Sequence, residues 1–270
     1  MLGKLMKYEF KACGRIFFPL YLGILLLAAI NGVNIGVNFK NEVVDGLPMN
    51  PLAYNTQGIL MLVLVALFVA LFVITIILTI QRFKKNLLDE EGYLMFTLPV
   101  RSSSLILSKL LVALIYAIIS AIVAALSFII MGAIGGDINV LELFKAFTHS
   151  GFLTEGIEFV VYMVVGFLIS YSIFVLTIYL SLSVGQLPQL SKHRVAAGVI
   201  VFFILNFIIS NIYNFVTNNL LGTETRVEFT SGFIVSNFSY VALDLVIGLT
   251  IGTGLFLLTN WILNKKLNLE

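Results

Sequence analysis

The chain has 270 residues, of which 60% are hydrophobic and only 11% are charged, and its net charge is +2. A soluble domain carries about a quarter charged residues, so this composition excludes a protein whose whole surface faces water. One cysteine excludes a disulfide framework, and the lack of HExxH, GxSxG and P-loop motifs argues against a metalloprotease, a serine hydrolase or an ATPase.

Six apolar stretches are long enough to cross a bilayer as helices, because about 20 residues span the ~30 Å hydrocarbon core. Their approximate ranges are 17–37, 59–80, 105–131, 158–184, 195–216 and 240–263. None of them alternates polar and apolar residues with the period of two that a membrane β-strand requires. The sequence therefore predicts one all-α, polytopic membrane domain over residues 1–270.

The basic residues predict which side of the membrane each loop faces. Thirteen of the 16 Lys and Arg residues lie at the two termini, around the 81–104 loop, or in the 186–194 loop. Since loops rich in Lys and Arg stay in the cytoplasm, both termini are expected there, in a multi-pass plasma-membrane protein. The weak net charge gives no indication of nucleic-acid binding.

Residues 1–16, ahead of the first span, have the pattern of an amphipathic helix. The bases on its polar face are Lys4, Lys7, Lys11 and Arg15. Such a helix is expected to lie in the cytoplasmic interface, with its bases near anionic head groups. Glu9 breaks the pattern, because it points from the middle of the apolar face and needs a basic partner. Arg82 or Lys85 in the next cytoplasmic loop would supply that partner.

The loop after the second span is dense in charge within a chain that has few charged residues. Its charged and aromatic residues are Arg82, Lys84, Lys85, Asp89, Glu90, Glu91, Tyr93 and Phe96. The preference for basic residues on the cytoplasmic side does not account for three acids there. A short helix that is charged on one side and aromatic on the other is expected to dock onto a cytoplasmic protein. The alternative is a solvated loop.

Uncharged polar residues form stripes on two of the spans. On the fifth span, Asn206, Ser210, Asn214 and Thr217 recur at helical spacing with Asn211 and Asn218 beside them, and all six fall within one arc of about 140°. Either they make hydrogen bonds between helices, worth about 0.6 kcal/mol each, or they line a translocation path. On the fourth span, Ser170, Thr177 and Ser181 share a face, and there the sequence favours hydrogen bonding.

Asp244 is the only acid inside a span, within ~8 Å of its outer boundary. It is expected to reach water or a neighbouring helix, and a proton or cation site is the alternative. Two pairs of glycines four residues apart, at Gly32 and Gly36 and at Gly248 and Gly252, predict sites where helices pack closely.

Residues 89–100, Asp-Glu-Glu-Gly-Tyr-Leu-Met-Phe-Thr-Leu-Pro-Val, followed by Ser108-Lys109-Leu110, resemble the first cytoplasmic loop of type-2 ABC export permeases. In that family an acidic segment with a glycine leads to a Leu-x-Thr-Pro-like turn, and a lysine opens the next span. Here the turn is Phe-Thr-Leu-Pro, a modest departure shared by permeases from Gram-positive bacteria. Residues 7–11, Lys-Tyr-Glu-Phe-Lys, also resemble that subgroup. The resemblance extends over the whole chain through the order of amphipathic helix, six spans and coupling loop.

The resemblance implies one membrane-spanning half of an ATP-driven exporter. Two permeases, as identical copies or as paralogues, would form a translocation path through the lipid bilayer. Residues 83–98 would be the coupling helix that docks on a separate ABC ATPase subunit, and residues 217–239 would form an external gate. ATP and Mg²⁺ would bind the ATPase, so this chain is expected to bind no cofactor or metal and to be no enzyme. An ion-coupled secondary carrier and a non-transporting membrane scaffold for a cytoplasmic partner remain as alternatives.

Overall fold

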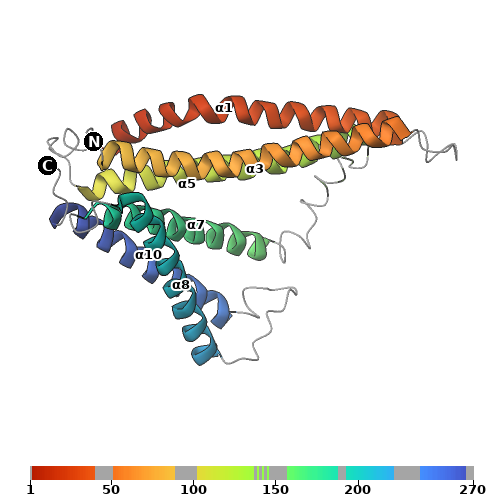
Figure 1. Ribbon diagram of the computed structural model, residues 1–270. Coiled ribbons are helices and arrows are strands. Elements are labelled where there is room, and N and C mark those ends of the chain that lie inside the picture. Colours follow the sequence, from red (N-terminus) through yellow and green to blue (C-terminus); the bar gives the residue numbers. More distant parts are fainter. Residues whose placement is uncertain are drawn as a thin grey trace. The chain divides into compact units, whose positions relative to one another are not determined.

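The computed structural model describes residues 2–39, 51–88, 102–136, 157–187, 193–221 and 238–265, together with Asn139, Glu142 and Lys145. These residues form six long α-helices and one short π-helix, and no strand occurs among them. The elements are α1 (Leu2–Asn34), η1 (Ile35–Phe39), α3 (Pro51–Leu87), α5 (Ser102–Gly135), α7 (Ile157–Gly185), α8 (Arg194–Leu221) and α10 (Phe238–Lys265) (Figure 1). All six α-helices are long and apolar enough to cross a membrane, which confirms the predicted all-α fold with six candidate spans.

Five predicted spans lie inside single α-helices and the first runs from α1 into η1, but the first three helices are longer than predicted. With 33, 37 and 34 residues, α1, α3 and α5 extend for roughly 50 Å or more, well beyond a ~30 Å hydrocarbon core. Residues 2–34 form one continuous helix, so the expected interfacial helix is not a separate element. Residues 83–87, which the sequence assigns to the coupling segment, continue α3.

The chain divides into two compact units, and α1, α3 and α5 contribute to both. The N-terminal unit comprises Lys7–Leu78 and Ile115–His149, and the C-terminal unit comprises Met1–Met6, Thr79–Leu114 and Ser150–Glu270. The helices α7, α8 and α10 lie entirely in the C-terminal unit.

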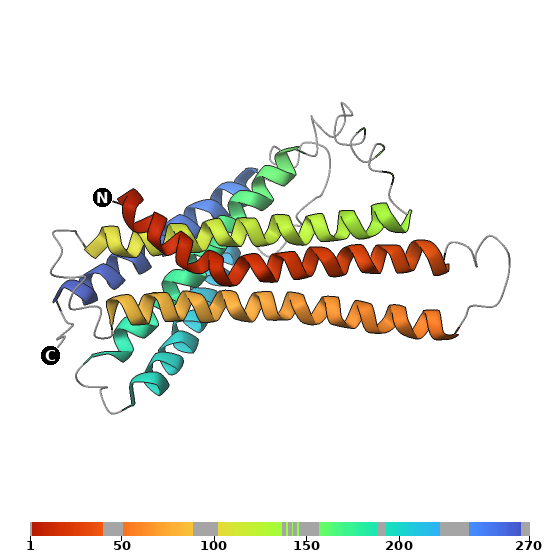
Figure 2. The ribbon, with the colours of Figure 1, turned by 90° about the horizontal axis from the view of Figure 1, so that it is seen from above.

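In the N-terminal unit, α1, α3 and α5 run alongside one another (Figure 2). The ring of Tyr116 on α5 stacks on Phe10 and Phe17 of α1, with centroids 4.9 and 4.6 Å apart. Its hydroxyl donates a hydrogen bond to the carbonyl oxygen of Phe10 at 2.7 Å, and the hydroxyl oxygens of Tyr21 and Ser120 lie 2.8 Å apart. Since lipid tails are as apolar as the helices, such stacking and hydrogen bonding hold membrane helices together.

Further along the same unit, Gly32 lets α1 approach the backbone of α5. A Cβ atom at Gly32 would lie 2.8 Å from the carbonyl oxygen of Met131 and 2.9 Å from Cβ of Ile134, so a larger residue would separate the helices. The predicted close-packing site is thus confirmed. Nearby Asn31, which is fully buried, donates a hydrogen bond from Nδ2 to the carbonyl oxygen of Leu60 on α3 at 3.3 Å.

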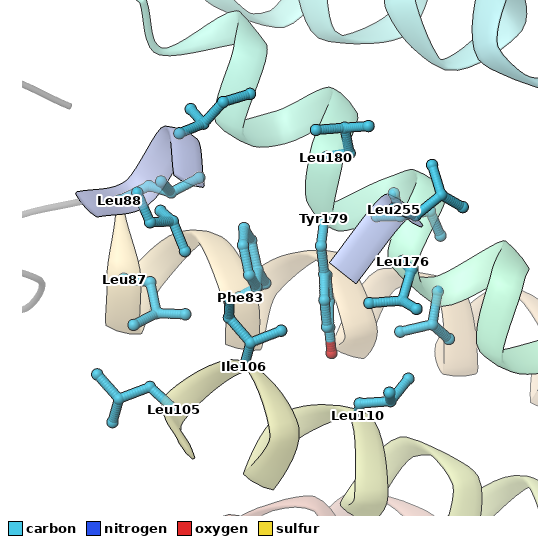
Figure 3. Close-up of a cluster of buried hydrophobic side chains, with 14 residues drawn as sticks. Phe83, Leu87, Leu88, Leu105, Ile106, Leu110, Leu176, Tyr179, Leu180 and Leu255 are labelled. Carbon is cyan, nitrogen blue, oxygen red and sulfur yellow. The ribbon is translucent and has the colours of Figure 1, made fainter. Parts of the chain in front are cut away.

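The core of the C-terminal unit is built around two stacked aromatic rings. Phe83 of α3 and Tyr179 of α7 are buried with ring centroids 4.1 Å apart (Figure 3). The labelled residues around them are Leu87, Leu88, Leu105, Ile106, Leu110, Leu176, Leu180 and Leu255. The cluster therefore joins the end of α3 and the start of α5 to α7 and α10. A hydrogen bond of 2.6 Å from Ser102 Oγ to Asn264 Oδ1 also connects the start of α5 with the end of α10.

Candidate binding pocket

Three helices of the C-terminal unit, α7, α8 and α10, surround a pocket within the expected membrane region. The helix α7 packs against both α8 and α10. At Gly248 of α10 an added Cβ would lie 2.6 Å from Cγ2 of Ile169 on α7, so the glycine permits this close approach. Gly252 is less tightly packed, because its added Cβ would be 3.8 Å from Ile173, an ordinary contact distance. The predicted close packing is confirmed at the first glycine of the pair.

The pocket has a volume of about 300 Å³ and a mixed lining. Its polar lining residues are Ser170 of α7, Asn206, Ser210 and Tyr213 of α8, and Asp244 of α10. Isoleucines, one leucine and two glycines supply the rest of the wall. A mostly apolar cavity with a few convergent polar groups is the usual form of a small-molecule site.

The carboxylate of Asp244 lies at the centre of a hydrogen-bonded triad that takes one residue from each helix. Tyr162 of α7 donates its hydroxyl hydrogen to Oδ2 of Asp244 at 3.1 Å, and Tyr213 of α8 donates to Oδ1. Each carboxylate oxygen has a second lone pair, so the triad can accept further hydrogen bonds. The acid thus contacts neighbouring helices, as the sequence led us to expect.

No basic residue near the triad balances this acid within the described parts of α7, α8 and α10. The bases on these helices are Arg194 and Lys265, at the start of α8 and the end of α10. Each is roughly 30 Å from the triad along its helix at 1.5 Å rise per residue. Arg226 lies outside the described residues. The three helices therefore present a carboxylate whose hydrogen-bond donors are neutral.

The predicted stripe on α8 only partly meets the pocket. Asn206 and Ser210 line it, whereas Asn214 and Thr217 do not. Asn206, Ser210 and Asn214 are exposed, and Thr217 is half-buried. Nδ2 of Asn206 donates to the carbonyl oxygen of Phe202 at 2.8 Å, and Nδ2 of Asn214 donates to that of Ser210 at 2.8 Å. Among the residues that the structure describes, neither amide bonds to another helix, so within one chain the stripe does not join helices.

The stripe on α7 divides between two roles. Thr177 and Ser181 are buried and donate hydrogen bonds to carbonyl oxygens of α7 itself, both at 2.8 Å. Ser170 is exposed and lines the pocket. Two of the three residues thus belong to the packed interior, while the third faces the candidate site.

The predicted coupling residues are only partly covered by the structure. Arg82, Lys84 and Lys85 lie near the end of α3, where Lys85 is exposed and the other two are half-buried. The other predicted coupling residues of this loop lie outside the described residues; they are Asp89, Glu90, Glu91, Tyr93 and Phe96. Glu9 is buried, with 9% of its surface exposed, which agrees with its expected position on the apolar face of the first helix.

Sequence reasoning missed the two tyrosine donors and the pocket itself. Tyr213 follows Ser210 by three residues and therefore belongs to the same face of α8. Tyrosine is counted as a hydrophobic residue when apolar spans are identified, so the hydroxyl group of Tyr213 was overlooked as a hydrogen-bond donor. A search for tyrosines at helical spacing from the polar stripe would have added Tyr213, but nothing in the sequence pairs Tyr162 with Asp244.

The chemistry of this site is that of recognition: a carboxylate attracts positive charge, and hydroxyl and amide oxygens accept hydrogen bonds. No protein family, no curated protein and no solved structure matches this chain. Its function is therefore inferred from the pocket, from the exposed stripe on α8 and from the motifs of the sequence.

Proposed function

We propose that this chain is the membrane-spanning permease subunit of an ATP-driven ABC exporter, working as a dimer with separate ATPase subunits. The observation that supports this most is the polar stripe on α8, a helix made mostly of apolar residues. Of its four residues, Asn206, Ser210 and Asn214 are exposed, and Thr217 is half-buried.

Polar side chains exposed on a membrane helix need a partner or water. Hydrogen bonds within α8 use one N–H of Asn206 and one of Asn214, and the amide oxygens remain as acceptors. Leaving such groups in hydrocarbon is costly. A second permease that covers α8, together with an aqueous path between the two copies, removes this cost. The stripe would then line the path.

The end of α3 and the start of α5 would connect the membrane helices mechanically to an ATPase. These two helix ends flank residues 89–101, which include most of the expected coupling helix (83–98), and both are packed in the core cluster around Phe83 and Tyr179. The same cluster includes residues of α7 and α10, two of the helices that form the pocket. An ATPase that moves the segment would therefore act on a packed body rather than on a loose loop.

The first turns of α1 fit a cytoplasmic interface. Lys4, Lys7, Lys11 and Arg15 are exposed, whereas Glu9, Cys13 and Phe17 are buried. At ~50 Å, α1 is long enough to place these turns outside the hydrocarbon core. With the positive-inside pattern, this supports a plasma-membrane permease with both termini in the cytoplasm.

The test is transport in proteoliposomes that contain the tagged chain and the ATPase purified with it. We expect export that needs MgATP and that stops when the ATPase carries an inactivating substitution.

Asp244 in the pocket favours one other function, an ion-coupled carrier. Flux driven by an ion gradient without ATP would establish that carrier and overturn the proposal. A protein that supports neither kind of flux would be a scaffold.

The docking part of the proposal has its own test. Phe96→Ala should release the ATPase, because truncating an aromatic hot spot costs ~2 kcal/mol or more. Replacing Glu90 and Glu91 with alanine should weaken binding most at low salt, since exposed charge pairs are screened as salt rises. Full ATPase co-purification and full transport with both variants would show that residues 82–98 are a solvated loop.

A further inference from the structure

We infer that the pocket between α7, α8 and α10 binds a small organic cation, with one protonated amine and a compact apolar body, and that Asp244 is its counter-charge. The identity of the exported substrate rests on the proposed function. Binding itself is a property of this chain and is measured without an ATPase.

The charge of the ligand follows from the surroundings of Asp244. Two tyrosine hydroxyls donate to its carboxylate, one from α7 and one from α8, and both are neutral donors. Within the described parts of the three helices, the bases lie roughly 30 Å away along α8 and α10. An acid at such a position in a span is costly unless something pairs with it, and such acids mark ion or substrate sites. A cation in the pocket would pair with it.

The polar lining supplies acceptors for an ammonium group. Asn206 donates its Nδ2 hydrogen to the carbonyl oxygen of Phe202, which orients the amide and leaves Oδ1 as the acceptor. The hydroxyl oxygens of Ser170 and Ser210 also line the cavity. An ammonium group has three N–H donors and no acceptor, so it complements a carboxylate surrounded by neutral oxygens.

The size and the apolar wall favour an organic cation over a bare metal ion. A pocket of about 300 Å³ is at the lower end of the range of small-molecule sites. Ile169, Ile173 and Ile209 give it walls that would contact a hydrocarbon body. Divalent metals prefer several carboxylate ligands, and no cluster of three metal-ligating residues occurs in the described part of the chain. The lining thus suits a monoamine with one small apolar group.

The experiment measures equilibrium binding of labelled 2-phenylethylamine to the purified full chain in lipid nanodiscs, with 2-phenylethanol as the neutral analogue of the same shape. Wild type should bind the amine and should bind the alcohol at least ~tenfold more weakly, since hydrogen bonds to a charged group are the stronger ones. Asp244→Asn keeps the side-chain shape and should weaken amine binding by a similar factor. Glu142→Gln removes the same charge outside the pocket and should leave binding unchanged.

A second variant, Ser170→Leu, keeps the test decisive if Asp244→Asn fails to fold. The Ser170 side chain makes no hydrogen bond within the described residues, so Ser170→Leu fills the pocket without removing one. It should weaken amine binding while the melting temperature stays near that of wild type. Three results would overturn the inference: no amine binding by wild type, equal binding of amine and alcohol, or amine binding unchanged in both pocket variants. Competition by NaCl or KCl but not by choline chloride would instead indicate a metal-ion site.

These outcomes separate the inference from the proposed function. Amine binding without ATP-dependent export would keep the pocket and overturn the exporter. ATP-dependent export without amine binding would keep the exporter and overturn the inferred substrate class.

Discussion

The N-terminal unit and the polar stripe on α8 of the C-terminal unit differ in how polar side chains inside apolar helices are used. In the N-terminal unit they join different helices: Asn31 on α1 bonds to α3, and Tyr116 on α5 bonds to α1. On α8 of the C-terminal unit, Asn206 and Asn214 bond to their own helix and are exposed. In the N-terminal unit these hydrogen bonds hold helices together. On α8 the amide oxygens remain available to accept hydrogen bonds from a ligand or a partner.

The comparison also separates two kinds of close contact between helices. Gly32 brings the backbones of α1 and α5 together in the N-terminal unit. Gly248 brings α10 against α7 at the wall of a pocket that contains an acid. The same small residue therefore serves packing in one unit and lines a pocket in the other. Substitutions that distinguish structural from functional polar groups test this contrast directly.

The largest expected effect on stability is at the aromatic core of the C-terminal unit. Phe83→Ala should lower the free energy of unfolding by ~3 kcal/mol or more, because it removes a buried ring and leaves a cavity beside Tyr179. Phe72→Ala on the same helix is the matched control, since that ring is 64% exposed. Unfolding by SDS in mixed micelles measures both variants. Equal losses would contradict a core at this end of α3.

The next effect is expected where α1 meets α5. Gly32→Leu should destabilise the chain by ~2 kcal/mol, because its side chain would collide with the backbone of Met131. Gly23→Leu is the matched control on the same helix, since no atom lies within 4 Å of a Cβ built there. Thermal unfolding in detergent should show a large drop in melting temperature for the first variant and little for the second. A similar drop for both variants would mean that any glycine-to-leucine substitution in α1 lowers the melting temperature, whether or not the position contacts α5.

The sequence predicted the features that depend on local composition and missed those that depend on contacts between distant residues. Span positions depend on local composition, and the predicted ranges fall within helices, the first of them running from α1 into η1. The last turns of α3 were missed because they hold bases, which reduce hydropathy, although Phe83 and Leu87 of these turns are buried in the core cluster. Periodicity placed Asn206 and Ser210 on one face but could not show which other helices meet them there. The pocket depends on contacts between α7, α8 and α10, separated by up to about 80 residues along the chain, and one sequence does not reveal such contacts.

A smaller effect is expected from single hydrogen bonds in the N-terminal unit. Tyr116→Phe retains the ring stack with Phe10 and Phe17 and removes only the hydroxyl that donates to α1. It should cost ~0.6 kcal/mol of unfolding free energy, the average for a hydrogen bond between membrane helices. The measurement is SDS unfolding, averaged over enough repeats to resolve that difference. A stability equal to that of wild type would show that the ring alone holds this contact.

The smallest effect on stability, and the sharpest test of the contrast, concerns the stripe on α8. Asn206→Leu combined with Asn214→Leu removes three hydrogen bonds that run within the helix, and leucine has the higher helix propensity. The free energy of unfolding should therefore change by less than ~0.5 kcal/mol, whereas export should fall because the proposed path would lose two acceptors. Asn31→Leu is the control from the other unit, because it removes a bond to α3 and should lower stability. The measurements are SDS unfolding and ATP-dependent transport of the same preparations. If the double variant lost stability and kept full transport, the amides of α8 would be packing groups like those of the N-terminal unit, and the contrast between the units would fail.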